Sequence, residues 1–349
     1  MVAFAASAQT AGAVFVNANS TSNEVWMYTR AANGALTLVG AFPTQGQGGS
    51  PGLGSQGGVA LANNNKFLYA VNAGSNEISG FLVKPTGLTF VGKVSSGGTF
   101  PNSVAASGTL LYALNSQGTS ANITGFRIQS NGALRPIPNS TRPLSADLPK
   151  PGQVGFTPDG KSLIVTEINT SKIDTYAIGT DGRATGPLVQ VSAGAGPFGF
   201  AFDNAGHLVI SEVTLSSASS YTVSGGLLNV VTGALPDFGK AACWVASTSN
   251  PNLPQQYSYI TNTGSDTVSG FAITSDGRIS LLQPDGKTAV LLPGAFPLDM
   301  AISRDSRYLY VLEGKLPGIA VFQINRDGSL TQVQDVRGIP STSYGMTGY

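Results

Sequence analysis

Three glutamates occur at the same place in a repeated sequence pattern, and their carboxylates are the groups of this chain best suited to acid–base chemistry. Glu167, Glu212 and Glu313 each end an apolar segment, and an aromatic residue follows each of them at one fixed spacing. Carboxylates that lie close together raise one another's pKa, so that one of them can act as a general base on water. We predict this role for Glu212 or Glu167, with Lys240 or asparagine and glutamine amides as donors to a developing oxyanion.

Polar residues at matching positions extend this set to a ring. The copies without glutamate have asparagine at the same place: Asn17, Asn72, Asn115 and Asn262. Residues that open the preceding segments approach the same face: Gln56, Asn102, Gln153, Phe198, Lys240, Asp299 and Ser341. Because convergent polar groups in a concave mouth are the usual setting of a ligand site, we predict a binding ring there. Its ligand-binding members are Asn17, Asn72, Asn115, Gln153, Phe198, Asn262, Asp299 and Glu313. The alternative is that these groups only satisfy strand-end amides and channel waters.

The elements that must position these residues are strands. The repeated unit is an apolar strand that ends in Asn or Glu, followed by a strand with an aromatic residue, as in residues 67–72 and 78–81. Turn signals such as Asn33-Gly34 and Asp181-Gly182 follow, and a further strand precedes each copy. The copies recur about every 50 residues and use the whole chain. We therefore predict an all-β, seven-bladed β-propeller with four-stranded antiparallel blades, in preference to a β-sandwich pair or a β-solenoid.

The two ends of the chain are predicted to share one blade. Residues 338–344 look like a first strand without partners, and residues 13–38 supply the later strands of a blade that lacks its first. Pairing them protects two exposed edges and closes the ring. We predict a single propeller domain over residues 13–349, preceded by a disordered tail or the remnant of a signal peptide at residues 1–12. The small residues of that segment favour a secreted or periplasmic protein over a cytoplasmic one.

Composition excludes several classes of protein. The 19 Lys+Arg and 18 Asp+Glu leave a net charge of +1, which is too little for a nucleic-acid binder. A hydrophobic content of 41% with this low net charge excludes disorder, and the absence of long apolar runs excludes a transmembrane segment. We expect a small-molecule ligand and a monomer, with neither nucleic acid nor membrane as a partner.

No dense metal-ligand motif is present, and no cofactor is predicted, although oxygen ligands around the axis would suit Ca²⁺ in the channel. His207, the only histidine, is expected to face solvent. With a single histidine and no serine partner motif, the sequence does not predict a Ser-His-Asp triad. Cys243, the only cysteine, is expected to be a buried packing residue. Two long segments, residues 45–54 and 139–150, are predicted to cross between blades and to line the mouth.

Several segments carry a resemblance to a known family. They are Pro158-Asp-Gly-Lys-Ser-Leu-Ile-Val165, Gly196-Pro-Phe-Gly-Phe-Ala-Phe202, Ala241-Ala-Cys-Trp-Val245, Ser303-Arg-Asp-Ser-Arg-Tyr-Leu-Tyr-Val-Leu312 and Asn325-Arg-Asp-Gly-Ser-Leu330. The repeats resemble those of the lactonase-type seven-bladed propellers of the YVTN kind, which include 6-phosphogluconolactonase and the fungal carboxymuconate lactonizing enzyme. The resemblance covers all seven blades and is more specific for fold than for chemistry.

Departures from the family pattern limit what the resemblance implies. In lactonizing members, catalysis is attributed to a histidine, arginines and a glutamate around the channel mouth. The glutamate falls on Glu212, whereas Phe198 stands at an arginine position and Gly152 and Gln153 at the histidine position. The resemblance implies hydrolysis or cycloisomerisation of a small lactone or carboxylic acid. The alternative is a non-catalytic propeller that binds a small molecule, glycan or protein on the same face, so the sequence leaves enzymatic activity open.

Overall fold

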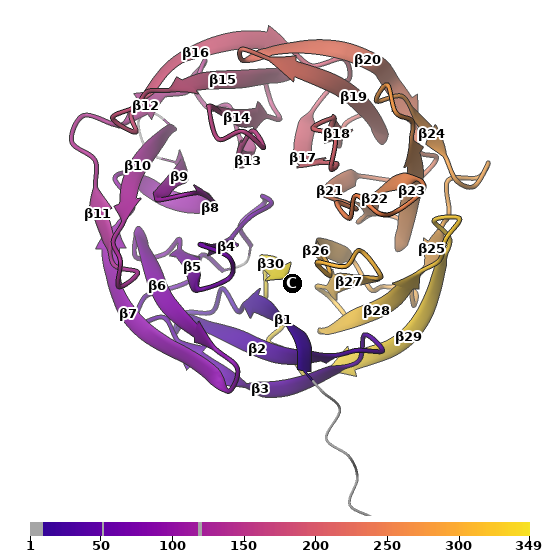
Figure 1. Cartoon of the computed structure of the whole chain (residues 1–349), viewed down its shortest axis with the longest axis horizontal. Helices are drawn as coiled ribbons and strands as arrows, with labels where there is room; N and C mark the ends of the chain where they lie inside the picture. Colours follow the sequence, from indigo (N-terminus) through magenta and orange to yellow (C-terminus); the bar gives the residue numbers. More distant parts are fainter. Residues whose placement is uncertain (1–9, 51, 118–120) are drawn as a thin grey trace, which may run out of the picture.

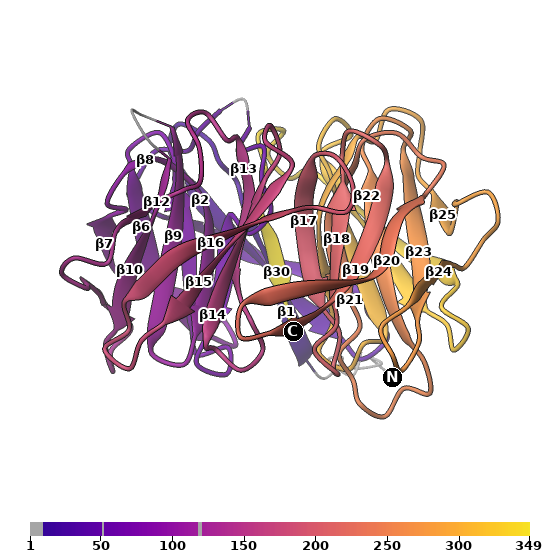
Figure 2. The ribbon, with the colours of Figure 1, turned by 90° about the horizontal axis from the view of Figure 1, so that it is seen from above.

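A computed structural model describes residues 10–50, 52–117 and 121–349 and confirms the predicted all-β architecture. These residues contain strands and turns but no helix, and so none that could cross a membrane. The strands form seven antiparallel sheets around one axis (Figure 1), and seen edge-on they run across the thickness of the ring (Figure 2). The molecule is a seven-bladed β-propeller, and its blades are numbered I to VII from the one that contains β1.

The first four blades are described from the innermost strand outward. Blade I contains β30 (Met346–Gly348), β1 (Thr10–Asn17), β2 (Glu24–Ala31) and β3 (Leu36–Pro43). Blade II contains β4 (Val59–Ala62), β5 (Phe67–Asn72), β6 (Glu77–Lys84) and β7 (Gly87–Ser95). Blade III contains β8 (Thr99–Ser107), β9 (Leu110–Gln117), β10 (Asn122–Ile128) and an outer edge split into β11 (Leu134–Pro136) and β12 (Arg142–Pro143). Blade IV contains β13 (Pro151–Phe156), β14 (Ser162–Glu167), β15 (Lys172–Ile178) and β16 (Ala184–Val191).

The remaining three blades follow the same order. Blade V contains β17 (Pro197–Phe202), β18 (Leu208–Glu212), β19 (Ser217–Ser224) and β20 (Leu227–Pro236). Blade VI contains β21 (Ala242–Ser247), β22 (Gln256–Asn262), β23 (Thr267–Ile273) and an outer edge split into β24 (Ile279–Leu281) and β25 (Ala289–Val290). Blade VII contains β26 (Pro297–Ile302), β27 (Tyr308–Glu313), β28 (Gly318–Ile324) and β29 (Leu330–Arg337).

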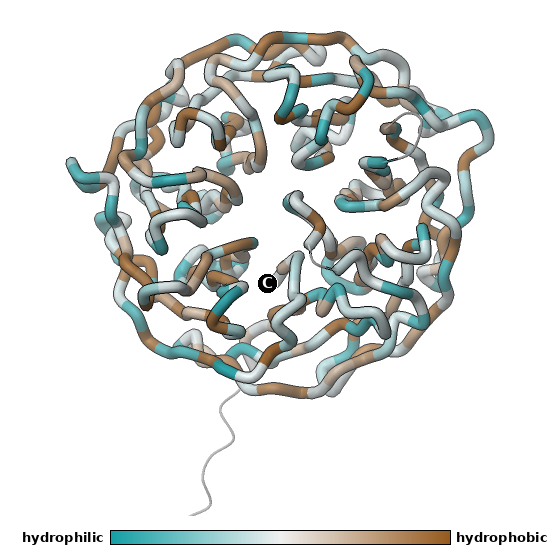
Figure 3. Tube along the Cα trace, turned by 180° about the vertical axis from the view of Figure 1, so that it is seen from behind, coloured by the Kyte–Doolittle hydropathy of each residue, from teal (hydrophilic) through white to brown (hydrophobic). Residues whose placement is uncertain are grey.

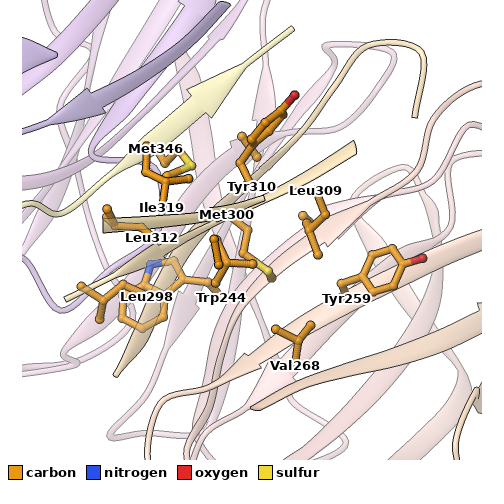
Figure 4. Packing of buried hydrophobic residues seen from close by; sticks show 14 of the residues in the cluster. Trp244, Tyr259, Val268, Leu298, Met300, Leu309, Tyr310, Leu312, Ile319 and Met346 are labelled. Carbon is orange, nitrogen blue, oxygen red and sulfur yellow. The ribbon is translucent and has the colours of Figure 1, made fainter. Parts of the chain in front are cut away.

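The core lies between neighbouring blades. Every residue of β5, β14 and β27, the second strands of three blades, is buried, whereas the outermost strand β29 is mostly exposed. Hydrophobic and hydrophilic residues accordingly alternate around the rim of the ring (Figure 3). The largest buried cluster joins blades VI, VII and I and includes Trp244, Met300 and Met346 (Figure 4). Burial of apolar faces between blades therefore stabilises the ring.

Buried tyrosines connect one blade to the next through the predicted hairpin turns. Their hydroxyls donate to turn-glycine carbonyls in four pairs: Tyr69 with Gly132, Tyr112 with Gly182, Tyr259 with Gly328, and Tyr310 with Gly34. All four tyrosines are completely buried, and all four glycines have positive φ. An unpaired buried hydroxyl would cost about 1–3 kcal/mol, so the turn glycines of the sequence repeat also serve as inter-blade acceptors.

The predicted closure of the ring is confirmed, but the closing strand lies elsewhere. β30 pairs with β1 in antiparallel register, with Phe15 opposite Thr347. Residues 338–344, predicted to be this strand, instead form turns and loop, so Ser341 does not open a strand. The chain turns at Gly345, whose φ is +95°, and only then enters the sheet. This turn is the reason why the strand begins after the predicted segment.

Arg30 in β2 further ties the two ends of the chain together. Its Nη2 donates to the carbonyl of Ala11 at 2.9 Å, and its Nε donates to the carbonyl of Tyr349 at 3.3 Å. The guanidinium is buried, with 3% of the side chain exposed. β1 begins at Thr10, inside the predicted tail of residues 1–12, and residues 1–9 of that tail lie outside the described part of the chain.

Removal of residues 340–349 should strongly destabilise the protein. The deletion exposes the edge of β1 and leaves the buried Arg30 without one of its acceptors. We expect the melting temperature to fall by roughly 10 °C or more in a thermal scan. Deletion of residues 1–9 is the matched control. A C-terminally truncated protein that melts like the full chain would contradict this closure.

Candidate functional site

The segment that precedes β4 projects into the central opening of the ring (Figure 1), and we call its residues Ser55–Gly57 the plug. The side-chain amide of Gln56 pairs with the backbone of Val245 in β21 as a neighbouring strand would. Gln56 Nε2 donates to Val245 O at 2.7 Å, and Val245 N donates to Gln56 Oε1 at 2.9 Å. The backbone N–H of Gln56 donates to the carbonyl of Gly152 in β13 at 2.9 Å. One residue of blade II thus connects blades IV and VI.

The neighbours of Gln56 complete the plug. The indole of Trp244 donates to the Ser55 carbonyl at 3.0 Å, and Ser55 Oγ donates to the carbonyl of Asn102 at 2.7 Å. Close packing requires glycine nearby, since a Cβ at Gly199 would lie 2.3 Å from Gln56 Oε1. The predicted crossing loop at residues 45–54 leads directly into this plug. The segment connects blades I and II, as predicted from its glycine content and length.

A cavity of about 600 Å³, the channel cavity, lies on one side of the plug. Its floor includes Gln56, Gly57 and Asp299, and its rim includes the hairpins at Asn63–Asn65 and Ser303–Arg304. Six blades contribute lining residues, and β30 contributes Met346–Gly348. The cavity therefore opens toward the hairpins that follow the innermost strands, on the face opposite to the ends of the second strands.

Asp299 supplies a carboxylate at the floor of the channel cavity. Its Oδ1 accepts from the N–H of Met300 at 2.9 Å, and its Oδ2 accepts from the N–H groups of Met346 at 3.1 Å and Gly57 at 3.5 Å. The residue is only 1% exposed, and this burial raises the pKa of Asp299 to about 7, against the opposing effect of the three N–H donors. Asp299 therefore fastens the closing strand to the plug and also titrates near neutral pH.

The walls of the channel cavity are polar but almost uncharged. Asp299 and Arg304 are the charged side chains among the described lining residues, and Arg304 lies exposed on the rim. The other polar side chains are amides and hydroxyls: Gln56, Asn63, Asn64, Asn65, Ser107, Gln153, Ser247, Ser249, Ser303, Thr347 and Tyr349. Such groups donate and accept hydrogen bonds, as hydroxyl-rich neutral ligands require.

One hairpin at this rim has an unusual backbone. Asn63, Asn64 and Asn65 all have positive φ, at 51°, 53° and 64°. Asparagine tolerates this left-handed conformation better than most residues, yet three in succession are costly. The strained turn directs an asparagine-rich segment to the edge of the channel cavity. Sequence reasoning missed these residues, although three consecutive asparagines in a hairpin were a visible signal.

The predicted ring at the ends of the second strands is sealed inside the blades. Asn17, Asn72, Asn115, Glu167, Glu212, Asn262 and Glu313 are at most 1% exposed, and none of them lines the channel cavity. Most pair with the residue seven positions later: Asn72 with Ser79, Asn115 with Asn122, Glu212 with Ser219, and Asn262 with Ser269. The predicted equivalence of the seven positions is therefore correct, but the structure does not bring these side chains together around the axis.

Loop glycines cover these strand ends. A Cβ at Gly194 would lie 2.3 Å from the carboxyl group of Glu212, and a Cβ at Gly239 would lie 2.3 Å from the amide carbon of Asn262. A Cβ at Gly46 would lie 2.4 Å from the side chain of Asn72, and a Cβ at Gly98 would lie 2.7 Å from that of Asn115. In these four blades the loop that enters the blade therefore covers the end of the second strand.

Glu212 and Glu167 accept hydrogen bonds from different partners at these buried strand ends. Glu212 Oε2 accepts from Ser217 Oγ at 2.5 Å, Oε1 accepts from Ser219 Oγ, and burial raises the pKa of Glu212. Glu167 accepts from Ser145 and from Thr170, the latter at 2.6 Å. Ser145 belongs to the predicted insertion 139–150, which folds over this carboxylate. Neither glutamate reaches a cavity from its position.

Asp174 is a buried carboxylate that the sequence reasoning missed. It lies on β15 beside Glu167, and both accept from the N–H of Ser145, at 2.8 Å and 3.0 Å. Burial and the charge of Glu167 raise the pKa of Asp174. The signal was present, since Asp174 follows Glu167 at the same seven-residue spacing as the Asn–Ser pairs.

The other predicted residues have varied surroundings. Gln153 pairs with the backbone of Phe200, with distances of 2.6 and 3.1 Å, and lines the channel cavity. Phe198 packs edge-on against Trp244, with ring centroids 4.9 Å apart. Lys240 is exposed and lines neither the channel cavity nor the plug. Of the predicted set, Gln153 and Asp299 are therefore the members that meet in one cavity.

Comparison with known proteins decides the family. A model of the family described as lactonase, seven-bladed β-propeller, matches residues 6–146 and 137–343. The chain belongs to this lactonase family. Family membership agrees with the blade count of the structure and with the resemblance of the sequence motifs.

Relatives of this lactonase-family propeller are distant. A 6-phosphogluconolactonase of Serratia proteamaculans is 24% identical over 60% of this chain, and the match spans 63% of that relative's length. The structure of a periplasmic gluconolactonase of Pseudomonas aeruginosa is 16% identical, with a TM-score of 0.76 over 97% of this chain and 98% of that one. A protein of Lactobacillus plantarum is 19% identical, with a TM-score of 0.77 over 98% of this chain and 100% of that one. The structural likenesses concern the fold.

Two predictions about single residues have opposite outcomes. His207 does not face solvent in this lactonase-family propeller, because it is 9% exposed and its Nδ1 lies 2.8 Å from Oδ2 of the buried Asp203. It lies directly before the second strand of blade V and packs against Gly277 of blade VI, so the next blade helps to cover it. Cys243 is buried as predicted, and burial raises the pKa of its thiol to about 12. Among the described residues, no group of three His, Cys, Asp or Glu side chains could hold a metal ion.

The Glu167–Asp174 pair should make stability depend on pH. Since the pKa of Asp174 is raised above its ordinary value of 3.8, the unfolded state loses this proton first as the pH rises. The pair's contribution is therefore complete below about pH 4 and is lost as the pH rises through the folded pKa. The Asp174→Asn variant, whose amide can donate to Glu167, should be more stable than wild type at pH 8 by at least about 1 kcal/mol.

The measurement is denaturant unfolding of both proteins at pH 5 and pH 8. The stability difference between variant and wild type should grow with pH. Asp276→Asn, in an exposed turn, is the matched control and should show no such trend. A constant difference between pH 5 and pH 8 would show that the pKa of Asp174 is not raised in the folded protein.

Proposed function

We propose that this protein hydrolyses an uncharged, hydroxyl-rich lactone of sugar size in the channel cavity. The observation that carries the proposal is the Asp299 carboxylate at the floor of the open cavity, with a pKa raised to about 7. A general base is most effective when its pKa is close to the working pH. Membership of the lactonase family and the likeness to a gluconolactonase support the reaction class.

Asp299 would act as the base in this reaction. Its carboxylate takes a proton from a water molecule, whose oxygen attacks the lactone carbonyl carbon. Hydroxyl and amide donors of the wall stabilise the resulting oxyanion. Collapse of the intermediate breaks the ring C–O bond, and the proton passes from Asp299 to the departing ring oxygen. The product is the open-chain hydroxy acid, and Asp299 returns to its ionised form.

The charge of the cavity favours a neutral substrate over a phosphorylated one. Phosphate sites in proteins usually combine several cations or backbone N–H groups. Among the described lining residues, the channel cavity has one cation, Arg304 on the rim, and a carboxylate at its floor. A phosphate ester would meet Asp299 without compensating charge. We therefore propose a non-phosphorylated sugar lactone as the substrate. We further propose that the protein is monomeric, is exported and needs no metal.

A second candidate function is binding of a neutral sugar without turnover. Three backbone N–H groups already bind the Asp299 carboxylate, which favours a structural role for this side chain. In that case the amides and hydroxyls of the wall would hold the ligand, and Asp299 would only fasten β30. The catalytic and the non-catalytic protein differ in whether the lactone is consumed.

Hydrolysis of D-glucono-δ-lactone followed by pH-stat, after subtraction of the uncatalysed rate, tests the proposal. We expect kcat/KM to rise about tenfold per pH unit below pH 7 and to level off above it, because the ionised form of Asp299 is required. Asp299→Asn should lower kcat at least about 100-fold. The 6-phosphorylated lactone should be a poorer substrate.

Controls separate a chemical role from loss of structure. Circular dichroism and melting establish that Asp299→Asn is folded, and the wild-type pH profile is an independent readout. Asp276→Asn, in an exposed turn, should retain full activity. Full activity in Asp299→Asn, or its loss only in Glu212→Gln, would overturn the assignment to the channel cavity.

A further inference from the structure

A second pocket lies on the other side of the plug. Its volume is about 450 Å³, and the chain that leads into the plug, Gly52–Gly54, forms part of its wall. Blades III and IV supply the rest, through Phe100, Asn102, Leu148, Lys150 and other residues. The pocket shares no lining residue with the channel cavity. We call it the plug-side pocket.

Asn102 lines this pocket and has a side-chain acceptor without a partner. The residue is 1% exposed, its side-chain Nδ2 donates to the carbonyl of Pro151 at 3.1 Å, and its backbone carbonyl accepts from Ser55 Oγ. Its Oδ1 is buried and has no partner among the described residues. A buried amide oxygen without a donor is costly, so this position favours a ligand that brings a hydroxyl group.

Lys150 gives the same pocket its charge. It is exposed and is the one charged side chain among the described lining residues of the plug-side pocket. No described acid forms an ion pair with it. An ammonium group with no internal partner beside a polar pocket is suited to a carboxylate.

The backbone holds these side chains at the pocket. Lys150 precedes Pro151, the first residue of β13, and Phe100 precedes Pro101, which lies near the start of β8. The φ values of Lys150 and Phe100 are +50° and +57°. Both conformations are unfavourable for residues with a Cβ. Positive φ also occurs at the equivalent positions before the innermost strands of two other blades, at Ala241 in blade VI and at Phe296 in blade VII. The strained backbone is therefore a feature of the fold. The fold therefore directs Lys150 to the pocket, whatever the ligand.

We propose that the plug-side pocket binds a small hydroxycarboxylate, with its carboxylate at Lys150 and a hydroxyl at the Oδ1 atom of Asn102. The apolar side chains of Phe100, Leu53 and Leu148 would pack against its carbon chain. A phosphate would use the charge but leave the amide oxygen without a donor, and a neutral sugar would leave Lys150 unused. The site is separate from the proposed hydrolysis, although lactone opening releases acids of this class.

Calorimetric titration of the full chain at low salt tests the site with three probes: sodium D-gluconate, D-glucose and sodium acetate. Gluconate carries both the charge and the hydroxyl groups, so it should bind at least about tenfold more tightly than glucose or acetate. Lys150→Gln should weaken gluconate binding at least about tenfold. Lys161→Gln, an exposed lysine at the opposite end of the same blade, should not change it.

Arg304→Gln identifies the cavity that binds the acid, because Arg304 is the cation of the channel cavity. The proposal predicts unchanged gluconate affinity in this variant. It is overturned if Arg304→Gln rather than Lys150→Gln weakens binding, if acetate binds as tightly as gluconate, or if gluconate does not bind to the folded protein. Lactone hydrolysis is measured separately, so failure of one proposal leaves the other testable.

Discussion

The pairing of the Gln56 side chain with the backbone of Val245 is the contact on which the arrangement of both cavities depends. A primary amide has the donor and acceptor of a peptide group, so a side-chain amide can pair with the edge of a strand in another blade. By this means a residue of blade II binds blade VI across the channel, while its own N–H binds blade IV. The plug held in this way separates the channel cavity from the plug-side pocket, and Asp299 joins it to the closing strand by accepting from the N–H groups of both Gly57 and Met346.

Much of the fold could be predicted because the repeat is long and regular. Turn dipeptides and alternating apolar strands determine a blade locally, and seven copies determine the ring. The closing strand was misplaced because residues 338–344 have strand-like composition, and only the left-handed turn at Gly345 decides where pairing begins. Contacts between distant segments, such as Gln56 with Val245, leave no local pattern and could not be predicted.

The candidate site illustrates a limit of reasoning from repeats. Residues that recur at this position of the blades, such as Glu212 and Asn262, serve the blade itself, because they bind hydroxyl groups of the adjacent strand in the same blade. A reaction needs asymmetry around the axis, and here it comes from residues that differ between blades. Asp299 and Gln153 were predicted by their place at the start of innermost strands, whereas Asn63–Asn65 required knowledge of which hairpin meets the channel cavity.

A crystal structure with D-glucono-δ-lactam, an analogue in which an amide replaces the lactone ester, tests the central claim most directly. If the plug determines the site, the analogue will lie in the channel cavity with its carbonyl group near Asp299, and the Gln56–Val245 pair will be intact. An analogue bound on the opposite face against Glu212, with the plug displaced, would contradict this account.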